Sequence, residues 1–255
     1  MKTIKTIFTI ICMLAVIFVV SGCEKKKETP SETEIYQKAI TYLYEKEYEK
    51  AYNTISKCKN STNKRIQYLM GDFYYYGYYV DENKETAFSW YEKSAKQGSE
   101  KAEYKVGMMY ETGEGVEKNY EEAFSWYEKS AKQNNLLAKQ EIAWAYIDGE
   151  GVEKNYEEAM KIGKELLKTE NSDGGQHIIG YLYDYGYGVK KDDKEAFSWY
   201  KKCADQGSRV CEYNVGLFYY YGAGTKKSKS EAKKWYKKSA LQGYENALDS
   251  LIKKY

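Results

Sequence analysis

The sequence predicts an all-α protein, a right-handed α-solenoid of stacked antiparallel helix pairs. A single proline among 255 residues favours helices over irregular structure. Residues 66–99 and 102–135 share the string AFSWYEKSAKQ, and three further copies of the unit follow. Recurrence at a fixed period is typical of solenoids. One glycine per unit marks a step of 36, 36, 37 and 36 residues, with Ala143 in its place in the third copy: Gly71, Gly107, Gly180 and Gly216.

The first 22 residues are predicted to be a signal peptide, outside the folded body. Lys2 and Lys5 precede an apolar run, residues 7–20, which is too short for a good transmembrane helix. The run ends in the string VSGC, which resembles the bacterial lipobox. This resemblance implies a lipid on Cys23 and an exported protein anchored to the bacterial cell envelope, on the periplasmic or extracellular face of a membrane. An ordinary signal peptide with an incidental cysteine is the alternative.

The chain after the signal peptide divides into a tether, an N-terminal helix pair, five repeats and a closing helix. Residues 23–33 are charged, hold the only proline and are expected to be the tether. Residues 34–64 look like a tetratricopeptide-like helix pair without a glycine turn, and residues 245–255 are expected to form a C-terminal capping helix. The five repeats are expected at residues 65–100, 101–136, 137–173, 174–209 and 210–244.

Each repeat is predicted to be a helix, a Gly-x-Gly turn and a second helix. Glycine permits the left-handed backbone that such turns need. Glutamate three residues after the N-cap gives a capping-box pattern in four of the five second helices. The second helices are expected to begin at Asn83, Asn119, Asn155, Asp192 and Ser228, and four of them to end at Gly98, Asn134, Gly207 and Gly243.

These features resemble the Sel-one-like repeat (SLR), a relative of the tetratricopeptide repeat. The matching signature over residues 66–244 is A-x-x-x-x-G-x-x-Y-x-x-G-x-G-V, then A-x-x-W-Y-x-K-x-A-x-x-G. The third unit departs from it at Ala143, Ile162-Gly163 and Leu167. The resemblance implies a concave surface that binds a protein or peptide partner. It leaves two alternatives open: an envelope enzyme or binder acting on peptidoglycan or penicillin-type ligands, and a purely structural spacer.

Comparison of the repeats separates two kinds of tyrosine. One kind recurs in all five units, for example at Tyr74, and is expected to pack between helices. The other kind occupies positions where sister units carry acids or small residues, so these positions are expected to be exposed. Tyr79 stands where every other unit has glycine, so its turn must be strained or differently shaped. The candidate partner-binding residues, for which packing between repeats is the alternative, are Tyr75, Tyr76, Tyr78, Tyr79, Tyr185, Tyr187, Tyr220 and Tyr221.

Cys203 and Cys211 occupy positions where the other units carry mostly small residues. Such residues are expected where the second helix of one unit approaches the first helix of the next. A disulfide and two small buried thiols would both fit. The SLR resemblance implies the disulfide, because a cysteine-rich bacterial branch of the family has clips between cysteines eight residues apart, and an exported compartment permits the bond. Cys58 has Ile66 at the partner position and is expected to be a free thiol.

No catalytic residue, cofactor site or metal site is predicted. His177 is the single histidine, whereas a zinc site needs several ligands. The strings at residues 198–201 and 61–64 match the S-x-x-K of penicillin-reacting serine enzymes, but the S-D-N and K-T-G companions are absent. No nucleic-acid partner is expected, because 40 basic and 38 acidic side chains nearly balance.

Overall fold

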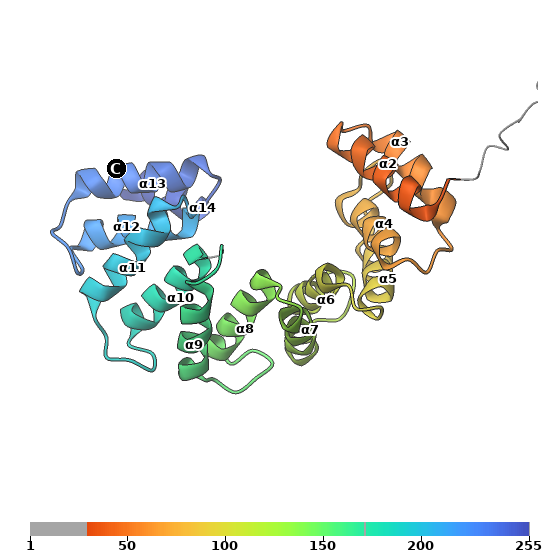
Figure 1. Cartoon of the computed structure of the whole chain (residues 1–255). Coiled ribbons are helices and arrows are strands. Elements are labelled where there is room, and N and C mark those ends of the chain that lie inside the picture. Colours follow the sequence, from red (N-terminus) through yellow and green to blue (C-terminus); the bar gives the residue numbers. More distant parts are fainter. Residues whose placement is uncertain (1–29, 171, 255) are drawn as a thin grey trace, which may run out of the picture.

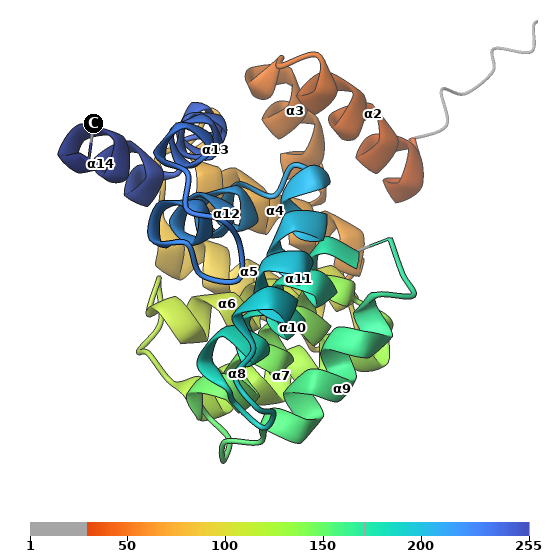
Figure 2. The same ribbon diagram turned by 90° about the vertical axis from the view of Figure 1, so that its left-hand side faces the viewer.

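The computed structural model describes residues 30–170 and 172–254, so the expected signal peptide and the lipidation site Cys23 lie outside the described residues. The described residues form thirteen α-helices and one short 3-10 helix, with no strand among them. In Figure 1 the helices follow an arch, with α2 and α3 at one end and α13 and α14 at the other. In the view turned by 90° both ends again lie above α7 and α9 (Figure 2). No helix in this part of the chain is long and apolar enough to cross a bilayer.

The N-terminal helix pair consists of α2 (Glu32–Tyr44) and α3 (Tyr48–Ile55), followed by the 3-10 turn η1 (Ser56–Cys58). Helix α2 begins inside the segment expected to be the tether. Ser31 explains this start, because its hydroxyl accepts the Glu34 N–H while the Glu34 carboxylate accepts the Ser31 N–H at 2.7 Å. This capping box satisfies two backbone donors that would otherwise lack partners.

Five antiparallel helix pairs follow, one for each expected repeat, and α14 (Glu245–Lys254) packs on the last of them. The first helix of each pair carries the recurring glycine, or Ala143 in the third. The pairs are α4 (Lys64–Tyr76) with α5 (Lys84–Ala95), α6 (Glu100–Thr112) with α7 (Tyr120–Lys132), α8 (Leu136–Asp148) with α9 (Tyr156–Leu166), α10 (Ser172–Tyr185) with α11 (Asp193–Asp205), and α12 (Arg209–Tyr221) with α13 (Lys229–Leu241).

The N-cap residues predicted for the second helices are confirmed, since each side chain accepts a backbone N–H of its helix. The reciprocal half of the predicted capping box does not form in these repeats. The N-cap N–H that a glutamate would bind donates instead to the carbonyl of the recurring tyrosine, at 2.8–3.0 Å. The pairs are Asn83 with Tyr74, Asn119 with Tyr110, Asn155 with Tyr146, Asp192 with Tyr183, and Ser228 with Tyr219.

The second glycine of the turn lies against the preceding repeat. A Cβ on Gly115 would be 2.3 Å from the carbonyl of Lys84 at the start of α5, so no side chain fits there. Tyr79 holds this position in the first repeat and keeps the left-handed backbone, with φ +68°. The conformation costs a non-glycine residue about 1–2 kcal/mol. Because Tyr79 keeps the backbone of the turn glycines, this turn is strained rather than differently shaped. The Tyr79 hydroxyl donates to Glu49 of α3 at 3.1 Å.

Three contacts recur between the two helices of a repeat. The first-helix glycine packs against a buried second-helix tyrosine, as Gly71 does against Tyr91. A second-helix serine donates to the first-helix backbone, as Ser94 Oγ does to the Lys64 carbonyl at 2.7 Å. A glutamine near the end of the second helix bonds a first-helix side chain; the pairs are Gln97 with Gln67, Gln133 with Glu103, Gln206 with Gln176, and Gln242 with Glu212.

The third repeat lacks the first two of these contacts. Gly163 stands in place of the buried tyrosine, and Leu166, fully buried, stands in place of the serine. A Cβ on Gly163 would lie 3.1 Å from the Ile179 side chain, and a Cβ on Gly175 would lie 2.5 Å from the Gly163 carbonyl. Helix α9 therefore packs unusually closely against α10 of the next repeat, which explains why small residues occur on both helices.

Candidate functional site

The first tyrosine cluster joins the turn of the first repeat to the N-terminal pair. The ring of Tyr78 stacks on Tyr48, the first residue of α3, with centroids 4.9 Å apart. Tyr76 packs on Tyr78 at 5.2 Å and on Tyr75 at 4.9 Å. The Tyr75 hydroxyl donates to Glu114 of the next repeat at 2.7 Å. The cluster thus bridges three consecutive helix pairs.

The second tyrosine cluster repeats this arrangement three units later. The ring of Tyr187, at the position equivalent to Tyr78, stacks on Tyr156 at 4.7 Å. Tyr156 is the first residue of α9, as Tyr48 is of α3. Tyr185 lies 5.4 Å from Tyr187 and 4.5 Å from Tyr181. A turn tyrosine that stacks on the preceding helix pair is therefore a structural device used twice.

The third tyrosine cluster lies at the end of α12. The rings of Tyr220 and Tyr221 meet edge to face at 5.0 Å. The Lys254 ammonium, from α14, lies 4.5 Å from the Tyr220 centroid and 5.5 Å from that of Tyr221. The C-terminal helix thus covers one side of this pair through a cation–π contact.

The structure divides the eight candidate tyrosines into two groups. The expectation of exposure is wrong for Tyr75, Tyr78, Tyr187 and Tyr220, which are half-buried. Their rings pack on neighbouring aromatic or lysine side chains, and these neighbours shield the rings from solvent. The other four are exposed: Tyr76 by 47%, Tyr79 by 52%, Tyr185 by 54% and Tyr221 by 66%. Only these four present a ring on which a partner could pack.

Trp144 joins the second cluster and was missed by the sequence reasoning. Its ring lies 5.0 Å from His177 and 5.2 Å from Tyr181, both on α10. The sequence did hold a signal that Trp144 is not part of the common core, because the equivalent positions in the other repeats hold dissimilar residues: Asp72, Met108, Tyr181 and Leu217. Burial lowers the pKa of His177 to about 4, so this side chain is neutral and packs as an aromatic ring.

An acidic cleft of about 50 Å³ lies between the second and third repeats. Glu111 and Glu141 both line it, and Trp144 forms part of the wall. Burial, together with the charge of Glu111, raises the pKa of Glu141 to about 7. The Tyr127 hydroxyl donates to Glu111, so this carboxylate is already engaged.

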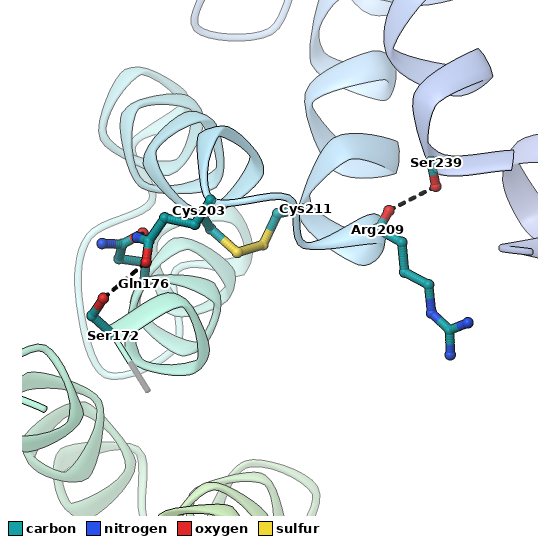
Figure 3. Close-up of a disulfide and its surroundings, with 7 residues drawn as sticks. Ser172, Gln176, Cys203, Arg209, Cys211 and Ser239 are labelled. Carbon is teal, nitrogen blue, oxygen red and sulfur yellow. Dashed lines mark hydrogen bonds between the residues drawn. A yellow bond between two sulfur atoms is a disulfide. The ribbon is translucent and has the colours of Figure 1, made fainter. Parts of the chain in front are cut away.

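Cys203 of α11 and Cys211 of α12 are joined by a disulfide, with Cα atoms 5.8 Å apart and both side chains buried (Figure 3). Cys203 takes the place of the serine that elsewhere bonds the backbone, as Ser239 does to the Arg209 carbonyl. One covalent link between repeats therefore replaces one hydrogen bond within a repeat. Cys58 is free and half-buried, and burial raises the pKa of its thiol.

In both S-x-x-K strings the lysine contacts a group other than the serine of its string. The Lys201 ammonium binds the Asp205 carboxylate one turn along α11. The Ser61 hydroxyl accepts the Asn63 N–H at 2.9 Å, and the Lys64 ammonium donates to the Gly98 carbonyl at 2.7 Å. Neither lysine is directed at its serine.

Residues 30–170 and 172–254 contain no group of three or more His, Cys, Asp or Glu side chains that could hold a metal ion.

Comparison with known proteins places these features in a family. The Sel1 repeat family matches more than half of the chain, at residues 66–99, 100–135, 137–162, 174–208 and 210–244. A Sel1 repeat protein from Oxalobacter formigenes is 33% identical, with a TM-score of 0.75 over 85% of this chain and 86% of that one. The protective antigen c5321 of uropathogenic Escherichia coli, which displays an SLR fold, is 25% identical, with a TM-score of 0.71 over 89% of this chain and 50% of that one. The search of the curated proteins found no match.

Proposed function

Because the chain belongs to the Sel1 repeat family, whose members are generally protein-interaction scaffolds, we propose that it is a non-catalytic adaptor at the bacterial cell envelope. In this proposal the chain is exported and a lipid on Cys23 anchors it to a membrane. The repeats then present their surface to a protein or peptide partner on the periplasmic or extracellular side.

The exposed tyrosines carry the proposal. Tyr76, Tyr185 and Tyr221 come from three different repeats and leave about half or more of their surface uncovered. The equivalent positions in the second and third repeats are Thr112 and Asp148, so the fold does not require a ring there. Tyrosine provides a large flat contact area and a hydroxyl at low entropic cost, which suits it to interfaces.

Site-specific crosslinking in cells tests the adaptor role. A photoreactive residue at position 76, 185 or 221 is expected to capture one defined protein, whereas the same residue at the exposed position of Lys132 on α7 captures none. The triple variant Tyr76→Glu, Tyr185→Glu, Tyr221→Glu, probed by a photoreactive residue at the neighbouring exposed position 79, is expected to lose capture while its helical circular dichroism is unchanged. Unchanged capture by the triple variant would remove the tyrosines from the interface.

The anchor and the absence of catalysis need separate tests. Cys23→Ala is expected to release the chain from the membrane fraction, and mass spectrometry of the N-terminal peptide is expected to show acyl chains on Cys23 in the parent. A parent chain that stays soluble contradicts the anchor.

Covalent labelling by a fluorescent penicillin, lost in a Ser198→Ala or Ser61→Ala variant, contradicts the non-catalytic role.

A further inference from the structure

A basic groove crosses the first helices of the first two repeats. It consists of two adjoining hollows, of about 400 and 620 Å³, that share Tyr68, Glu100 and Lys101. The cations along it are Lys64, Arg65, Lys101 and Lys105, and the single acid in its lining is the half-buried Glu100. The net charge of the groove is therefore positive.

The four cations lack acidic partners. None of the eight ion pairs in the described part of the chain involves them. The ammonium groups of Lys64 and Lys105 bond only neutral oxygens, the Gly98 carbonyl at 2.7 Å and the Tyr76 hydroxyl at 3.0 Å. Arg65 and Lys101 are exposed. This positive charge is thus not held in ion pairs within the described part of the chain.

Two nearby acids offset part of this charge but do not line the groove. Asp72 accepts the Tyr91 hydroxyl at 2.7 Å, and burial raises the pKa of its carboxyl to about 6 although Lys105 and Lys101 act in the opposite direction. Glu103 is buried, accepts the Gln133 amide at 2.7 Å, and has its pKa raised by burial. Both carboxyls are directed into the helix packing, so neither is available to the groove.

The repeats show that the fold does not require these cations. Arg65 and Lys101 occupy one equivalent position in the first two units, where the other three carry Leu137, Gly174 and Val210. The tyrosines between the cations are held firmly, because Tyr68 packs on Tyr91 at 5.5 Å and Tyr104 packs on Tyr127 at 5.7 Å. Leu137, 49% exposed, continues the groove with an apolar surface.

We propose that the basic groove binds an acidic peptide segment of the partner, in which two or more carboxylates flank an apolar or aromatic side chain. The carboxylates would meet Arg65 and Lys101, and the apolar side chain would pack on Tyr68, Tyr104 and Leu137. This inference rests on the proposed adaptor function and specifies the chemistry of the partner. Charge complementarity of this kind sets orientation and rate of association more than affinity, so strong salt dependence is expected.

Fluorescence anisotropy with a defined probe tests the groove. The probe is a fluorescein-labelled peptide Glu-Glu-Leu-Asp-Glu-Phe, added to the full-length chain in detergent. Its control replaces every acid by the matching amide. Binding is expected for the acidic peptide only, and the double variant Arg65→Glu, Lys101→Glu is expected to weaken it by about tenfold or more. The matched variant Lys226→Glu, Lys227→Glu, in the exposed turn of the fifth repeat, is expected to leave it unchanged.

Two outcomes of the anisotropy experiment overturn the groove. Equal loss in both double variants would show attraction by overall charge, and equally tight binding of polyphosphate would show a general anion site. The adaptor role is judged separately by crosslinking from positions 76, 185 and 221. A partner captured equally by the Arg65→Glu, Lys101→Glu variant contradicts the groove alone, whereas peptide binding without any captured partner contradicts the adaptor role alone.

Discussion

Gly71 and Tyr91 are packed so closely that a methyl group on Gly71 would lie 2.5 Å from the tyrosine ring. The same relationship holds between Gly107 and Tyr127, between Gly180 and Tyr200, and between Gly216 and Tyr236, at 2.7, 2.9 and 2.6 Å. The third repeat reverses the sizes, with Ala143 on the first helix and Gly163 on the second. The ring and the glycine are therefore one packing unit, and a change in one requires a change in the other.

Gly71→Ala is expected to destabilise the protein by about 1–3 kcal/mol, because the added methyl group forces the buried Tyr91 ring out of its place. In a Tyr91→Ala background the same substitution is expected to be neutral or stabilising, since alanine favours helix over glycine by about 1 kcal/mol. Urea unfolding followed by circular dichroism measures both steps. Equal effects in the two backgrounds would show that the ring is not the obstacle.

The glycine–tyrosine pairing also separates the features that the sequence could predict from those that needed the structure. The glycine spacing and the caps were sufficient to predict the helices, because each depends on residues close in the chain. The exchange of Ala143 and Gly163 was visible as two separate departures from the repeat. Only the contact between positions 20 residues apart joins them into one compensated change, and that contact is a fact of packing.

The second prediction concerns the disulfide. Cys203→Ser with Cys211→Ala installs the residue pair found at Ser94 and Ala102, and is expected to lower the free energy of unfolding by about 2–3 kcal/mol. Urea unfolding of the oxidised parent and the double variant measures the loss. The intact mass of the parent is expected to rise by two hydrogens on reduction of the disulfide. Cys58 is already a free thiol and adds nothing to this change. A parent already fully reduced after export would falsify the link.

The third prediction separates two tyrosines of the same candidate set. Tyr78→Ala is expected to destabilise the protein by about 1–3 kcal/mol, because the ring stacks on Tyr48 and meets Phe73 edge-on. Tyr221→Ala is expected to change stability by about 0.5 kcal/mol or less, since this ring is 66% exposed. Thermal unfolding compares the two. Equal shifts would mean that exposure does not distinguish stacking tyrosines from surface tyrosines.

For the candidate tyrosines, the sequence could predict which positions lie outside the common core but not which residues cover them. Substitution by acids in sister repeats indicated that positions 75 and 78 were not core, but it could not reveal that Glu114 and Tyr48 cover them. Those partners belong to neighbouring helix pairs, and their distance in space depends on how the pairs stack. The stacks of Tyr78 on Tyr48 and of Tyr187 on Tyr156 follow one rule, which needs the three-dimensional register of successive pairs to be recognised.

The last prediction is a gain of stability on mild acidification. Glu141 has its pKa raised from 4.5 to about 7 by burial and by Glu111 across the cleft. Between these values the folded chain binds more protons than the unfolded chain, so the free energy of unfolding falls as pH rises. Glu141 is therefore expected to contribute on the order of 1–3 kcal/mol more stability at about pH 5 than at about pH 8, while His177, with its pKa lowered to about 4, acts in the opposite direction.

Glu141→Gln isolates this contribution, because it keeps the size of the side chain and removes its charge. The variant is expected to be more stable than the parent at about pH 8 and nearly equal to it at about pH 5, where the parent carboxyl is protonated. Asp72, with its pKa raised to about 6, and His177, with its pKa lowered to about 4, remain in both proteins and contribute residual slopes of opposite sign. Urea unfolding at the two pH values provides the comparison, with Glu121→Gln on the exposed side of α7 as the control. Identical slopes for Glu141→Gln and the control would mean that Glu141 ionises normally in the folded chain.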